Sequence, residues 1–120
     1  MCRVFIADDV PAMRSLWRLF LEEDPGIAVV GEAGDGDAAL AGVEETRPDV
    51  LLLDLSMPER DGLEVIPVVR TASPETAIVV ASGFTAARMA PQALELGAAA
   101  YFEKGGSSDV LRRIVRDACA

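Results

Sequence analysis

The sequence contains no histidine and a single lysine, Lys104, beside ten arginines. Without histidine, Ser-His-Asp and Cys-His catalytic sites, zinc deaminase sites and most transition-metal sites are excluded. Any ammonium group in a functional site must therefore come from Lys104 or from the N-terminus. The two cysteines, Cys2 and Cys119, lie near opposite ends of the sequence. In a reducing cytosol we expect no disulfide framework, and two cysteines without histidine make a poor metal site.

Long apolar runs and basic clusters are missing as well. No run approaches the roughly 18 apolar residues that a membrane span requires, and residues 1–4 lack the layout of a signal peptide. We therefore expect a cytoplasmic protein that does not contact a membrane. With 20 acidic and 11 basic residues the formal net charge is −9, which argues against a nucleic-acid-binding surface. A hydrophobic fraction of 51% in 120 residues predicts one domain, residues 1–120, with a substantial core.

The chain alternates β-branched runs with helical patterns, which predicts βα units and a parallel sheet. We expect strands at residues 3–7, 27–32, 49–54, 77–82 and 99–102. The run 49–54 is the most uniformly apolar, so it should be the central strand, buried on both faces. The fold class is α/β: an open, doubly wound sheet of five strands and five helices, with helices on both faces.

Prolines, capping residues and the spacing of apolar residues indicate where the helices lie. Pro11 suits the first turn of the first helix, Asp37 can cap the second, which runs to about residue 46, and Ser107 or Ser108 can cap the last. The third helix, at about residues 63–71, contains Pro67, which either lies inside it or marks its true start. The fourth helix is indicated by the spacing of small and apolar residues from residue 86 to residue 97.

In such a sheet the ligand site lies beyond the carboxyl ends of the strands. The residues at those ends carry acidic, small or basic side chains: Asp8 and Asp9, Asp54, Ser82 and Gly83, and Lys104. Taken singly, each has an ordinary interpretation as a helix cap, a turn residue or a solvated surface residue. Their joint occurrence at four strand ends favours a site.

Three close carboxylates repel one another unless a cation lies among them, and Mg²⁺ prefers such oxygen ligands. The Asp54 carboxylate could then attack a phosphoryl group and form an acyl phosphate. Lys104 and Ser82 could hold the remaining phosphoryl oxygens, and Gly83 leaves space for the group.

These residues together resemble a response-regulator receiver domain of bacterial two-component signalling, over essentially the whole chain. The resemblance rests on Asp8-Asp9, the segment 54–62 (DLSMPERDG), Ser82-Gly83 and the segment 101–104 (YFEK). The segments 29–36 and 94–98 resemble receivers of transcriptional regulators that carry a helix-turn-helix output.

The resemblance implies a flavodoxin-like sheet of strand order 2-1-3-4-5 and a role for each site residue. Asp54 is the implied phosphoacceptor, and the implied Mg²⁺ ligands are Asp8, Asp9, Asp54 and the backbone carbonyl of Ser56. Ser82, Gly83, Lys104 and Tyr101 are the implied phosphoryl-binding and switch residues, with Ser56 and Phe84 at the mouth of the site. The chain departs from many relatives in having Gly105 rather than proline after Lys104, so we expect a trans bond and a looser loop there.

The resulting hypothesis is a phosphorylation switch and not an enzyme acting on a separate substrate. The implied partners are a sensor histidine kinase and an output domain or partner protein, including a second copy of this chain on phosphorylation. The face made by the fourth helix, fifth strand and fifth helix would report the change. The alternatives are a small phosphohydrolase with an aspartyl nucleophile, a flavin-binding module and a purely structural domain. The sequence leaves open the kinase, the signal and the output, and whether this is a stand-alone receiver or an N-terminal domain.

Overall fold

The computed structural model describes residues 1–58 and 60–120, so Glu59 of the segment 54–62 lies outside the described residues. Five parallel strands form one sheet in the order β2-β1-β3-β4-β5, which confirms the predicted fold class and strand order. The strands are β1 (Cys2–Ala7), β2 (Ile27–Ala33), β3 (Val50–Leu53), β4 (Ala77–Ser82) and β5 (Ala100–Glu103). The helices are α1 (Pro11–Glu22), α2 (Gly36–Thr46), α3 (Gly62–Ala72), α4 (Ala86–Leu96) and α5 (Ser108–Cys119).

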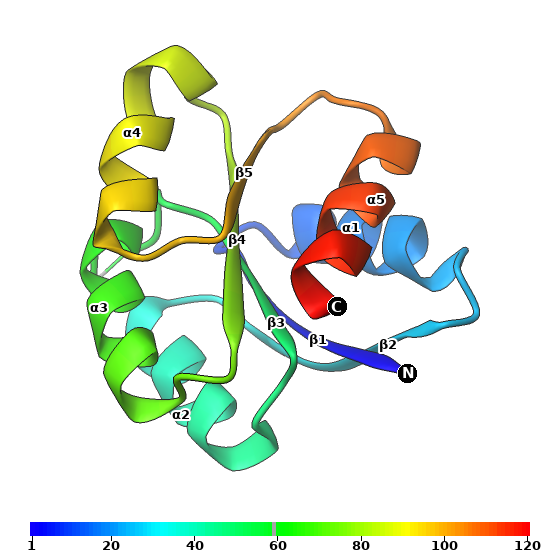
Figure 1. The fold of residues 1–120 in the computed structure, drawn as a ribbon, viewed down its shortest axis with the longest axis horizontal. Helices are drawn as coiled ribbons and strands as arrows, with labels where there is room; N and C mark the ends of the chain where they lie inside the picture. Colours follow the sequence, from blue (N-terminus) through cyan, green and yellow to red (C-terminus); the bar gives the residue numbers. More distant parts are fainter. Residues whose placement is uncertain (59) are drawn as a thin grey trace.

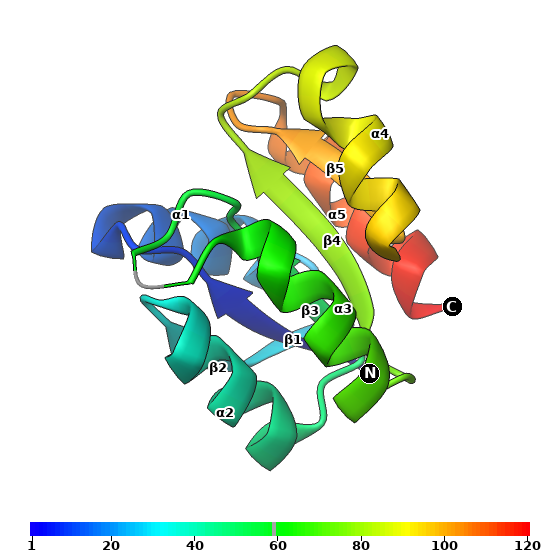
Figure 2. The same cartoon turned by 90° about the vertical axis from the view of Figure 1, so that its left-hand side faces the viewer.

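The sheet lies between two layers of helices (Figure 1). Helices α2, α3 and α4 cover one face, as Figure 2 shows, and α1 and α5 cover the other. Successive residues of a strand point to opposite faces, so β3 supplies both cores. Leu51 and Leu53 join the core beneath α2 and α3, whereas Val50 and Leu52 join the core that contains Trp17. All four residues of β3 are buried, as predicted for the central strand.

One helix cap differs from the sequence prediction, and an alternative left open for the third helix is decided. Asp35, not Asp37, caps α2, because its backbone is extended and its side chain accepts a hydrogen bond from the Ala38 N–H at 2.8 Å. Asp61 caps α3 by accepting the Leu63 N–H at 2.9 Å, so Pro67 lies inside the helix and does not start it.

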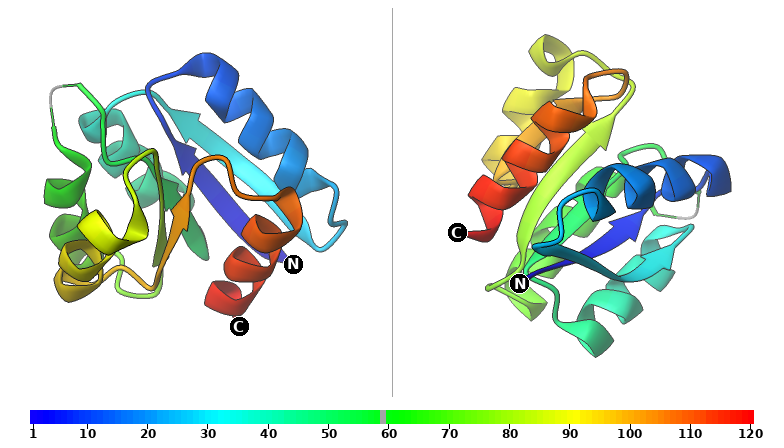
Figure 3. Two further views of the ribbon diagram at one scale, coloured as in Figure 1. Left: turned by 90° about the horizontal axis from the view of Figure 1, so that it is seen from above. Right: turned by 90° about the vertical axis from the view of Figure 1, so that its right-hand side faces the viewer.

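The expectation that the chain forms no disulfide framework was wrong. Cys2 and Cys119 form a disulfide, with their Cα atoms 6.0 Å apart, although 117 positions separate them in the sequence. The reason is the topology: the start of β1 and the end of α5 lie at the same end of the molecule (Figure 3).

Among residues 1–58 and 60–120, no helix combines the length and the apolar character that crossing a membrane requires.

Candidate functional site

Asp8 and Asp54 are neighbours because they follow the two adjacent strands β1 and β3. The strand order reverses direction between these strands, which is where open α/β sheets bind ligands. The backbone N–H of Asp54 donates to the Ala7 carbonyl at 2.9 Å and extends the hydrogen-bond ladder of the sheet as far as Asp54. Carboxylate oxygens of Asp8, Asp9 and Asp54 lie within 4.8 Å of one another. Asp8 and Asp54 are buried, whereas Asp9 is exposed.

Lys104 reaches this cluster from the end of β5. Its backbone N–H donates to the Ser82 carbonyl at 2.7 Å. Its side-chain Nζ lies 3.0 Å from Asp8 Oδ2 and 3.4 Å from Asp54 Oδ1. Gly105 follows at φ +99°, a left-handed conformation that glycine adopts without strain. No cis peptide bond occurs in the described parts of the chain, so the Lys104–Gly105 bond is trans, as predicted.

The charges of the cluster perturb its ionisation. Burial raises the pKa of Asp54 to about 6, the positive charge of Lys104 opposes this rise, and the negative charge of Asp8 adds to it. Burial alone would lower the pKa of Lys104, but its hydrogen bond to Asp8 and the charges of both aspartates outweigh burial and raise that pKa. Lys104 therefore carries its positive charge between two buried carboxylates.

Besides Lys104, three groups hold Asp8, and the sequence analysis predicted none of them. The Val10 N–H donates to Asp8 Oδ1 at 3.0 Å, and the indole Nε1–H of Trp17 donates to Oδ2 at 3.4 Å. Arg14 donates from Nη1 to the Asp8 carbonyl at 2.7 Å. Trp17 is a buried residue of α1, and no local spacing in the sequence signals that its one polar atom reaches the end of a strand.

The proposed switch residues Ser82 and Tyr101 both bind the backbone of Phe84. The Ser82 Oγ, which is fully buried, accepts the Phe84 N–H at 3.1 Å. The Tyr101 hydroxyl donates to the Phe84 carbonyl at 2.9 Å. One residue thus connects the two side chains, a link that the sequence did not reveal.

A hollow of about 480 Å³ opens between the loop that follows Asp54 and the start of α4. It is lined by Leu55, Ser56, Met57, Asp61, Leu63, Phe84, Arg88 and Met89. Phe84 is 38% exposed, and its ring lies under the Arg88 guanidinium of α4, 5.1 Å from ring centroid to Cζ. Phe84 therefore both borders the hollow and packs on α4.

The two glycines near the site, Gly62 and Gly83, differ in how closely other atoms approach them. A Cβ on Gly62 would lie 2.5 Å from the Leu55 Cα, so only glycine allows α3 to start against the loop after Asp54. A Cβ on Gly83 would meet nothing within 4 Å, so protein packing does not require glycine there. Ser56 is exposed, and its N–H donates to Asp54 Oδ1 at 3.3 Å.

The donor set of this edge suits a hard divalent cation. Asp8, Asp9 and Asp54 offer only oxygen, and Mg²⁺ binds one or two carboxylates while retaining waters. An oxygen-only set that includes an exposed member, Asp9, leaves room for those waters and for a phosphate oxygen.

Comparison with known proteins identifies the architecture. A family model, the response regulator receiver domain, matches residues 4–116. The chain belongs to this family. The receiver domain is similar over 98% of its length to the solved signal receiver domain of the putative response regulator NarL from Mycobacterium tuberculosis, of which 95% is covered, with 35% identity and a TM-score of 0.93.

Two curated relatives are longer proteins of different kinds. The uncharacterized transcriptional regulatory protein YhcZ of Bacillus subtilis (strain 168) is 41% identical over 99 residues, which cover 82% of this chain and 46% of YhcZ. A protein-glutamate methylesterase/protein-glutamine glutaminase of Maricaulis maris (strain MCS10) is 38% identical over 104 residues, which cover 85% of this chain and 26% of that protein. The chain thus spans less than half the length of either relative.

Proposed function

We propose that this receiver domain is a phosphorylation switch in which Asp54 accepts a phosphoryl group from a histidine of a partner kinase. The observation that carries the proposal is the environment of Asp54: a 3% exposed residue whose carboxylate is grouped with Asp8 and Asp9, with the Lys104 Nζ at 3.4 Å. In the reaction an Asp54 oxygen bonds to phosphorus while the bond from phosphorus to the kinase histidine breaks. Residues 1–120 contain no histidine, so the donor histidine lies outside them.

The residues around Asp54 divide the work of holding the phosphoryl group. Asp8, Asp9, Asp54 and the Ser56 carbonyl would hold Mg²⁺, which supplies positive charge against the phosphoryl oxygens. Lys104 supplies a second positive charge, and it reaches a phosphoryl oxygen by exchanging its contact with Asp54 for one with the group bound there. The open space beside Gly83 accommodates the group, and the Ser82 hydroxyl donates to one of its oxygens.

The bonds to Phe84 suggest how the signal leaves the site. Phosphorylation adds about −1.5 to −2 charges beside Ser82. If the Ser82 hydroxyl turns toward that charge, its bond with the Phe84 N–H at 3.1 Å is weakened and the segment 83–85 shifts. The Tyr101 hydroxyl, which is bound to the Phe84 carbonyl, then loses its outward partner, and the ring moves inward beneath α4. A pair of structures with and without a phosphoryl mimic on Asp54 tests this, and an unchanged Tyr101 rotamer with an unmoved segment 83–85 would exclude the mechanism.

The face formed by α4, β5 and α5 is the proposed output surface. The resemblance to YhcZ supports control of transcription, through an output domain or a dimer formed on phosphorylation, whereas the methylesterase relative carries a different output. Sedimentation of the phosphorylated and unphosphorylated chain measures the dimer directly. A separate catalytic function has less support, because the residue two positions after Asp54, where phosphohydrolases of this type place a second acid, is Ser56.

Incubation with a small phosphodonor tests the proposal. With Mg²⁺ the intact mass should rise by one phosphoryl group, and with a chelator it should not. Asp54→Asn should abolish the rise, while Asp61→Asn, which alters an exposed carboxylate of the hollow next to the Asp54 loop, should retain it. Full labelling of the Asp54→Asn variant would overturn the assignment.

A further inference from the structure

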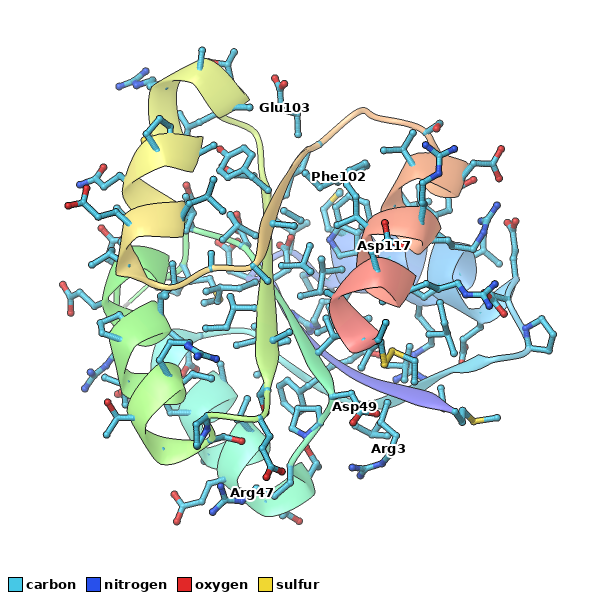
Figure 4. The ribbon with its side chains drawn as sticks, in the orientation of Figure 1. Arg3, Arg47, Asp49, Phe102, Glu103 and Asp117 are labelled. Atoms are coloured by element: carbon cyan, nitrogen blue, oxygen red, sulfur yellow. A yellow bond between two sulfur atoms is a disulfide. The ribbon has the colours of Figure 1, made fainter. Side chains whose placement is uncertain are left out.

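The disulfide between Cys2 and Cys119 joins two parts of the fold that differ in how firmly they are held. Cys2 is fixed in the sheet: its N–H donates to the Gly26 carbonyl at 2.8 Å, and it pairs with Ile27 of β2. Cys119 is the last residue of α5. Figure 4 shows the sulfurs bonded between the end of α5 and the start of β1, close to Asp49.

The position of Cys119 follows from the helical repeat of α5. Leu111 and Val115 are fully buried, and Cys119 lies one further turn along the same stripe. Past Val115 the last turn touches the core only through the partly buried Ala118 and Cys119, as far as the described residues show. The Arg116–Asp24 ion pair, at 3.0 Å, involves a 67% exposed arginine, and such surface pairs contribute little. The disulfide is therefore the main attachment of the last turn of α5 to the sheet.

The pair is open to small reagents. A hollow of about 450 Å³ is lined by Met1, Cys2, Gly26, Asp49, Arg116, Cys119 and Ala120. Cys119 is partly exposed, whereas Cys2 is buried, with 8% of its surface exposed. A reagent entering the hollow thus meets Cys119 first, and the Cα separation of 6.0 Å is in the range that a disulfide needs without backbone movement.

We propose that Cys2 and Cys119 form a reversible redox site that responds to small-molecule disulfides and controls the order of the last turn of α5. The Cys119 thiolate attacks the reagent RSSR, forming a mixed disulfide and releasing one RS⁻. The Cys2 thiolate then attacks the Cys119 sulfur and releases the second RS⁻. The net reaction converts two protein thiols and RSSR into one protein disulfide and two RSH, and a small thiol reverses it.

The crosslink should change both the stability and the local order of the domain. It closes a loop of nearly the whole chain, and the lost entropy of the unfolded state corresponds to a rise in Tm of about 10 °C or more. Amide exchange in the last turn of α5 should be about tenfold slower in the crosslinked form, since fraying there requires the helix end to leave the sheet.

Equilibration of the folded chain in oxidised and reduced glutathione at a series of ratios tests the proposal. Alkylation and intact mass measurement should show two free thiols in reducing buffers and a disulfide in oxidising ones, with little mixed disulfide between. In Cys119→Ser the Tm should not depend on the buffer, and in Cys2→Ala the single Cys119 should accumulate one glutathione. If the Cys2→Ala variant does not fold, because Cys2 is buried, the comparison of wild type with Cys119→Ser still tests the proposal.

Three results would overturn the proposal. The first is two thiols that stay free in fully oxidised glutathione, and the second is a disulfide that a small dithiol cannot reduce in the folded protein. The third concerns Asp49, whose carboxylate lies within 4.8 Å of both sulfurs. If the reduced chain binds one zinc ion and this zinc blocks oxidation, the three residues form a metal site instead. All three are independent of Asp54 phosphorylation, which is measured separately.

Discussion

Replacing Asp54 by asparagine should stabilise the metal-free domain at neutral pH. Burial and the Asp8 charge raise the pKa of Asp54 from 3.8 to about 6 in the fold, even though Lys104 opposes the rise. The folded state therefore binds the Asp54 proton more tightly than the unfolded chain does. The stability that this proton contributes is fully present below pH 3.8 and is lost as the pH rises through about 6.

The size of the effect follows from the pKa shift. A rise of the Asp54 pKa from 3.8 to about 6 corresponds to about 3 kcal/mol, and solvent screens little of this energy because the side chain is only 4% exposed. Asparagine has the same shape without the charge, and Lys104 keeps its contact with Asp8 at 3.0 Å. At pH 7.5 the free energy of unfolding of the variant should exceed that of the wild type by about 2–3 kcal/mol, which is about 10 °C in Tm for a domain of this size.

Urea unfolding in the presence of a chelator, from pH 4 to pH 8, measures this difference. Other carboxylates titrate in both proteins and cancel, so the difference between the two isolates Asp54. It should be near zero at pH 4 and grow to its full value by pH 7. Asp9→Asn, which alters the exposed member of the cluster, is the matched control and should show a smaller gain. An Asp54→Asn variant no more stable than wild type at pH 7.5, or a gain that does not vary with pH, would refute the reasoning.

Three further predictions concern the metal, the mouth of the site and the backbone. Titration with Mg²⁺ should change the fluorescence of Trp17, the single tryptophan, because its indole N–H contacts the proposed ligand Asp8; it should also raise Tm by linkage, and the absence of both effects would contradict the proposed metal site. Phe84→Ala should shorten the lifetime of the phosphorylated form by opening the hollow to water, as monitored by loss of the added mass; an unchanged lifetime would assign Phe84 to packing on α4. Gly62→Ala should lower the free energy of unfolding by about 2 kcal/mol or more, whereas Gly83→Ala should leave it unchanged, and equal effects in a thermal scan would contradict the close approach of α3 to Leu55.

The sheet and the carboxylate cluster were predictable because both follow from rules that act along the chain. The apolar run of β3 marked the central strand, and the convergence of parallel strand ends brought together Asp8, Asp54 and Lys104. The features that the sequence did not reveal depend on side chains that meet across the packed layers. The bond from Trp17 to Asp8 and the pairing of Cys119 with the start of β1 require the placement of α1 and α5 on the sheet, which no local pattern encodes.

The link through Phe84 was missed for a different reason. Ser82 and Tyr101 were each predicted to be switch residues, but they are linked through the backbone N–H and carbonyl of Phe84. Every residue except proline has these two groups, so the residue type does not reveal the link. Only the path of the loop after β4 shows that both bind the same residue. The cap of α2 was misplaced by two residues for a similar reason, since Asp35 and Asp37 are equally good caps by residue type.

The central claim is that Asp54 carries the phosphoryl group. Its most direct test is to phosphorylate the wild-type chain with a small phosphodonor and Mg²⁺, reduce the acyl phosphate with borohydride, and map the modified residue by peptide mass spectrometry. Reduction converts a phosphorylated aspartate into homoserine, so we expect homoserine at position 54 and at no other acidic position. Homoserine at Asp8, Asp9 or another residue, or none at all in a chain that has gained the phosphoryl mass, would contradict the claim.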